Sequence, residues 1–143
     1  MDLIQEYLTL VIDIVYHPKI TETAYFIDYH KEHNRKVTRM HNIATIIEKK
    51  HPDLKSEFCK LLFHESSGVR LWVAHHILEV MNCDKAYRKI ALREIRHNAR
   101  TDKTANGFGE RVWLKCTSKE SKALLRMTIF SPISGCCFMA NFC

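Results

Sequence analysis

One row of cations in this sequence has the spacing of a binding face for an anion. Its members recur at steps of four, four, three and four residues: Lys85, Lys89, Arg93, Arg96 and Arg100. On a helix these positions span about 80° of one face, away from the apolar side. Ammonium and guanidinium groups in such a row can contact phosphates or a carboxylate-rich protein surface. We therefore predict a binding face here, flanked by Arg88, with a solvated helix face as the alternative.

Two further sets of residues qualify as binding candidates, and each also has a structural explanation. The first set is a basic segment that contains Arg35, Lys36, Arg39, Lys49 and Lys50. Its two lysines fall at an expected helix C-terminus, where cations interact favourably with the helix dipole. The second set is Trp72 and Trp113, for which core packing is the default. A partly exposed Trp72 would instead anchor a partner.

Charge is distributed unevenly along the chain. The 143 residues carry a formal net charge of +6. The first 33 residues hold six acidic residues and two lysines, a net charge of −4, which leaves +10 for the remainder. An acidic end joined to a basic body forms a dipole that can steer an anionic partner. Solubility alone is the alternative explanation.

The residues that catalysis or a metal would need do not form a recognised pattern. His30 and His33 have the spacing of two ligands on one helix face, but no His-Asp dipeptide or Cys-x-x-Cys pair is present in the chain. Gly107-Phe108-Gly109 is too short to cradle a phosphate, and we expect a turn and a helix N-cap there. We expect no enzyme activity, no catalytic residues, no bound metal and no cofactor.

The six cysteines are expected to be free and buried rather than bridged. The N-terminus is acidic, and Asp13 interrupts its apolar run, so it lacks the basic start of a secretory signal. No apolar run reaches the ~18–20 residues of a membrane helix. These features predict a cytoplasmic protein without membrane attachment.

Helical periodicity runs through almost the whole chain, and Gly and Pro are scarce, with four and three copies. We predict seven or eight helices, near 3–16, 21–33, 35–50, 52–63, 69–81 and 85–98, then one from Gly107 that holds Trp113 and one over 119–130. Helices of this length with short connections pack as antiparallel hairpins. The prediction is a single all-α domain over residues 1–130, followed by an apolar, cysteine-rich tail over 131–143.

The stretch from Leu62 to Ile77 resembles the turn and second helix of a HEAT repeat. It contains Leu62-Phe-His64, then Val69-Arg70, then the small residue Ala74. The resemblance implies that Arg70 points back to groups at the turn and the neighbouring repeat. The family's Asp position is His64 here, so the usual Asp–Arg clasp is not available. Residues 34–113 as a whole are similar to small bacterial HEAT-like domains, some of which are immunity proteins that neutralise a cognate toxin.

Together these features favour a non-enzymatic protein-binding module, built as a HEAT-like stack of antiparallel helical hairpins whose extended face suits recognition. The resemblance implies a cytosolic bacterial immunity protein that binds a toxin domain. Either the acidic first 33 residues contact that toxin, or the toxin is itself acidic. The alternative is a nucleic-acid-binding helical-repeat protein that uses the 85–100 row and the 35–50 segment.

Overall fold

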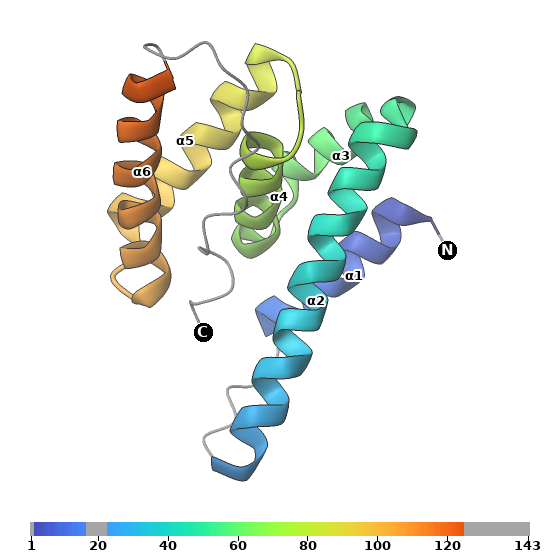
Figure 1. Cartoon of the computed structure of the whole chain (residues 1–143), viewed down its shortest axis with the longest axis vertical. Helices are drawn as coiled ribbons and strands as arrows, with labels where there is room; N and C mark the ends of the chain where they lie inside the picture. The colour runs from blue at the N-terminus through green and yellow to red at the C-terminus, as the bar shows by residue number, and fades with distance from the viewer. Residues whose placement is uncertain (1, 17–22, 125–143) are drawn as a thin grey trace. The chain divides into compact units, whose positions relative to one another are not determined.

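The computed structural model describes residues 2–16 and 23–124, with side chains described for 2–16 and 29–118. Within these residues the secondary structure is entirely helical, which confirms the all-α prediction (Figure 1). The helices are α1 (Leu3–Tyr16), α2 (Thr23–Lys50), α3 (Lys55–Lys60), α4 (Ser67–Glu79), α5 (Lys85–Thr101) and α6 (Ala105–Leu124). Short 3₁₀ turns, η1 (Pro52–Leu54) and η2 (Leu61–Phe63), flank α3.

The chain divides into two compact units, the first over residues 1–95 and the second beginning at Arg96. The division falls within α5, which is one continuous helix. The domain boundary expected at residue 130 lies outside the described residues, as does the tail over 131–143.

Two of the expected helices form one, because α2 runs without a break from Thr23 to Lys50. The prediction of separate helices over 21–33 and 35–50 was wrong at residue 34. An asparagine inside a helix costs well under about 1 kcal/mol relative to alanine, so Asn34 alone does not end one. Ion pairs from Glu32 to Arg35 (2.7 Å) and to Lys36 (3.7 Å) also bridge the expected break.

The end of the described chain departs from the prediction in a similar way. The helices expected from Gly107 and over 119–130 are one helix as far as Leu124, so the described residues contain six α-helices rather than seven or eight. Gly107 and Gly109 lie inside α6, and the turn expected there was wrong. Thr104 caps the helix instead, since its Oγ1 atom accepts a hydrogen bond from the Asn106 amide (3.3 Å).

The core of the first unit forms where α1 packs against both α2 and α4 (Figure 1). The helix α2 contributes a stripe of buried residues: Met40, Ile43, Ala44 and Ile47. The two helices α1 and α4 approach closely at Gly68, where an added Cβ would lie 2.6 Å from Val15 Cγ2. A glycine at this position therefore permits the contact. The fully buried residues of α1, α3 and α4 complete this core: Tyr7, Val11, Phe58, Val69, Val73, Ala74 and Ile77.

A buried polar pair links α1 to α4 inside this core. The Tyr7 hydroxyl lies 2.7 Å from His76 Nδ1, and the Tyr7 ring also packs edge-on against Phe58 at 4.8 Å between centroids. His76 Nδ1 is 3.1 Å from the Trp72 carbonyl oxygen, so both neutral tautomers of His76 have a hydrogen-bond partner. His76 is therefore a hydrogen-bonded residue of the core.

The described cysteines differ in their exposure to solvent. Cys59 and Cys83 are free and buried as expected, whereas Cys116 is free but exposed on α6, so the expectation of burial was wrong there. The other three cysteines lie outside the described residues. No described helix is both long and apolar enough to cross a membrane.

Acidification is expected to destabilise the fold through His76. Burial lowers the pKa of His76 from 6.5 to about 4. Between these pH values the unfolded chain binds a proton that the folded chain does not, so the free energy of unfolding falls as the pH drops. This group should cost about 2 kcal/mol between neutral pH and about pH 5, measured by urea unfolding.

Two variants test whether His76 causes this pH dependence of the free energy of unfolding. His76→Gln should unfold more easily at neutral pH but with a weaker pH dependence, because the titrating group is gone. His51→Gln, which changes an exposed histidine, should keep the wild-type dependence. An unchanged pH dependence in His76→Gln would contradict the assignment.

Candidate functional site

The helix α5 presents the predicted row of cations to solvent. Ala91, Ile95 and Ala99 recur at steps of four and are buried, which fixes the inward side of the helix. All five members of the row are exposed: Lys85, Lys89, Arg93, Arg96 and Arg100. The row covers fifteen residue steps on one helix, a length of roughly 22 Å at 1.5 Å per residue.

The cations of this row have no ion pair or hydrogen bond to any described residue. The one acidic residue of α5, Glu94, lies off the row and is paired with Arg70. The positive charge of the row is therefore uncompensated within the described part of the chain. Such a surface attracts anionic groups, most strongly at low ionic strength.

Three cations of the other basic segment, which covers residues 35–50, form ion pairs within the first unit. Arg39 on α2 forms a bidentate ion pair with Glu6 on α1. Its Nε atom donates to Oε1 at 2.7 Å, and its Nη2 atom donates to Oε2 at 2.8 Å. Lys36 pairs with Asp13 of α1, and Arg35 pairs with Glu32 one turn earlier. The hydrogen bond from Arg39 lowers the pKa of Glu6, so the carboxylate stays ionised. Three of the acids in the first 33 residues and three of the cations in the 35–50 segment thus neutralise one another.

Arg88, predicted to flank the row, points toward the end of the preceding helix. Its Nη1 atom donates to the carbonyl oxygens of Ile77 and Met81, both at 3.2 Å, and its side chain is half-buried. These carbonyls follow the last intrahelical bonds of α4 and need a donor. Arg88 therefore joins α5 to α4 in addition to carrying charge.

Arg70 bonds the turn that precedes its own helix, α4. Its Nη1 atom donates to the carbonyl oxygens of His64 (2.8 Å) and Glu65 (2.9 Å). Its Nε atom donates to Glu94 of α5 at 3.0 Å, which links α4 to α5. Sequence reasoning missed Glu94. Glu94 lies beside the buried residues of α5, and this position could have indicated a contact with another helix.

Trp72, the predicted anchor, is half-buried on α4. Its indole stacks on the His76 ring, with 6.2 Å between centroids and 21° between planes. One face of the indole is thus occupied by the core, and the remaining surface is partly open to solvent. Trp113 on α6 is buried, in line with core packing.

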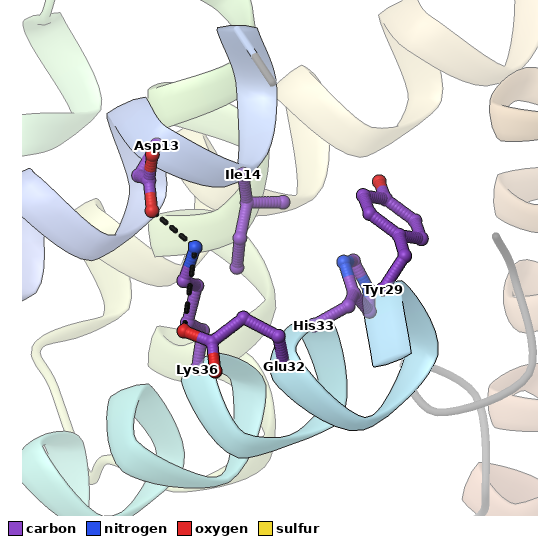
Figure 2. A pocket seen from close by; sticks show the side chains of 6 residues that line it. All are labelled: Asp13, Ile14, Tyr29, Glu32, His33 and Lys36. Carbon is purple, nitrogen blue, oxygen red and sulfur yellow. Dashed lines mark hydrogen bonds and ion pairs between the residues drawn. The ribbon is translucent and has the colours of Figure 1, made fainter. Parts of the chain in front are cut away.

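The histidines considered as metal ligands lie near a small pocket between α1 and α2. Asp13, Ile14, Tyr29, Glu32, His33 and Lys36 line it (Figure 2). Figure 2 shows the Lys36 ammonium between the carboxylates of Asp13 and Glu32, with which it forms ion pairs. Burial, together with the charges of His30 and Lys36, lowers the pKa of His33. A metal ion here would meet the charge of Lys36, and the described residues contain no group of three or more metal-ligating side chains.

Comparison of the chain with protein-family models, with curated proteins and with solved structures finds no match. Among the described residues, the uncompensated cations of α5 are the main indication of a binding function.

Two alanine substitutions on α5 should separate structural from surface arginines. Arg88→Ala removes the donor to the α4 carbonyls, and the free energy of unfolding should fall by about 1–2 kcal/mol. Arg93→Ala removes an exposed cation from the same helix and should change it by less than about 0.5 kcal/mol. Urea unfolding of the two variants measures both values. An equal loss in the two variants would contradict the structural role of Arg88.

Proposed function

We propose that this protein is a non-enzymatic binding module of the cytoplasm that uses the basic face of α5 to hold an acidic surface of a partner protein. The observation that supports it is the row of five exposed cations without a partner among the described residues. Carboxylates across an interface would supply the missing charge, and arginine is well suited to this because its guanidinium binds carboxylates in a bidentate way.

The distribution of ion pairs favours an acidic partner over a basic one. Glu6, Asp13 and Glu32 already contact cations of α2. A basic partner that approached these three carboxylates would compete with internal ion pairs, whereas an acidic partner meets cations of α5 that have no counterion among the described residues. Charge complementarity of this kind raises association rates and selects among partners.

The more specific form of this proposal is an immunity protein that binds and neutralises a toxin domain. It rests on the resemblance to small bacterial HEAT-like domains. In the same proposal the helices form a HEAT-like stack, which is supported by the bonds from Arg70 to the turn before α4 and by the buried small residue Ala74. Given the α5 row, the toxin domain would present an acidic surface.

Affinity purification from the native host tests the proposal. The wild-type chain should retain a stoichiometric protein partner, and the double variant Arg93→Glu with Arg96→Glu should lose it, because two attractive contacts become repulsive. The control is Lys103→Glu with Lys115→Glu, which changes the net charge equally at two exposed positions outside the row. This control should retain the partner.

The proposal fails if the wild-type chain retains no stoichiometric protein. It also fails if both double variants lose the partner equally, since the loss would then follow net charge rather than the α5 face.

A nucleic-acid partner is the second candidate, favoured by the length of the row. A cationic helix face of roughly 22 Å can follow several successive phosphates. If all five cations contact phosphates of a duplex, the logarithm of the binding constant should fall with the logarithm of salt concentration with a slope of about −4 to −5. Absence of any shift with duplex DNA or RNA at low salt would remove this candidate.

A further inference from the structure

Two thiols from distant parts of the sequence meet inside the first unit. Cys59 lies on α3, and Cys83 lies in the turn between α4 and α5. Their sulfur atoms are 3.3 Å apart, and the Cys59 thiol donates a hydrogen bond to Cys83 Sγ. The side chains are 1% and 8% exposed, so the contact is largely shielded from solvent.

The groups around the pair favour a thiolate on Cys83. The hydrogen bond from Cys59, together with the positive charges of Lys55 and Arg88, lowers the pKa of the Cys83 thiol. The same contact and burial raise the pKa of Cys59, which acts as the donor. A thiol with a lowered pKa beside a second thiol has the arrangement of a redox-active pair.

Neighbouring contacts hold the turn that carries Cys83. Glu48 at the end of α2 accepts a hydrogen bond from the Asn82 amide at 3.1 Å and pairs with Lys55 at 2.8 Å. On the other side, Arg88 donates to the Met81 carbonyl oxygen at 3.2 Å. Both bonds hold the peptide group between Met81 and Asn82, which directly precedes Cys83.

We propose that Cys59 and Cys83 form a modification site, which a hydroperoxide such as hydrogen peroxide converts into an intramolecular disulfide. The Cys83 thiolate attacks one peroxide oxygen, the O–O bond breaks, and Cys83 becomes a sulfenic acid while hydroxide leaves. The Cys59 sulfur then attacks the Cys83 sulfur, the S–O bond breaks, and a second hydroxide leaves. With the two thiol protons, the products are one disulfide and two molecules of water.

The geometry requires only a small movement. The sulfur atoms must close from 3.3 Å to about 2.05 Å, the length of a disulfide bond. The product would tie α3 to the turn that begins α5. This inference does not rest on the proposed function, because it concerns only side chains of the first unit.

Peptide mapping of the full-length protein tests the site. Trypsin places the described cysteines in separate peptides: Cys59 in 56–60, Cys83 in 71–85 and Cys116 in 116–119. After hydrogen peroxide treatment and alkylation under denaturing conditions, mass spectrometry should find peptides 56–60 and 71–85 joined, with the loss of two hydrogen atoms. A reductant should release them.

Three single variants define the roles of the thiols. Cys116→Ser, at an exposed position, should leave the joined peptides unchanged. Cys59→Ser should accumulate a sulfenic acid on Cys83, detected with dimedone, because the second thiol is missing. Cys83→Ser should show little dimedone labelling of Cys59. Circular dichroism establishes that each variant is folded.

Two results would overturn the inference. One is a wild-type protein in which Cys59 and Cys83 both remain alkylatable thiols at peroxide concentrations that oxidise Cys116. The other is a sulfenic acid on Cys59 in Cys83→Ser with none on Cys83 in Cys59→Ser, which would reverse the assignment of the attacking thiol.

Discussion

Each α-helix ends with carbonyl groups that have no donor within the helix, and in this chain arginine side chains supply donors at three turns. Arg70 bonds the carbonyls of the turn before α4, and Arg88 bonds those at the end of α4. In the second unit Arg111 does the same for α5, with Nη1 2.7 Å from the Ala99 carbonyl oxygen. Each arginine lies near the beginning of its own helix. The contact therefore fixes how that helix is rotated about its axis.

The rotation of α5 decides which of its cations are available. With Arg88 directed at α4 and Glu94 held by Arg70, the row on the opposite side faces solvent. Glu6, Asp13 and Glu32 cannot neutralise it, because they pair with residues of α2. The chain thus separates its charges into a compensated group within the first unit and an uncompensated row along α5. The functional proposal rests on this separation.

Local patterns predicted much of this arrangement. The span of α1, the buried stripe on α2 and the exposed row on α5 follow from helical periodicity, which depends only on residue type and spacing. The continuity of α2 through Asn34 was not predictable in this way, since it depends on ion pairs and packing against α1. The turn expected at Gly107 failed for a related reason. An added Cβ there would collide with the Asp102 carbonyl oxygen, so this glycine permits a close approach between the first turn of α6 and the residues that precede it.

The candidate site also contains contacts that helical periodicity does not predict. The exposure of Lys89 and Arg93 could be predicted from helical periodicity. The hydrogen bonds from Arg88 to carbonyl oxygens could not, because those oxygens lie at the end of another helix. The pairing of Glu94 with Arg70 and the meeting of Cys59 with Cys83 each join residues 24 positions apart. Contacts of this range depend on tertiary packing, which spacing along one helix does not encode.

Site-specific photo-crosslinking in the native host tests the binding role of α5 most directly. A photoreactive amino acid at position 86, exposed beside the row, leaves all five cations in place, and the same group at exposed position 56 on α3 is the control. The account predicts a discrete adduct with an acidic protein from position 86 and none from position 56. Adducts from position 56 alone, or equal adducts from both, would contradict it.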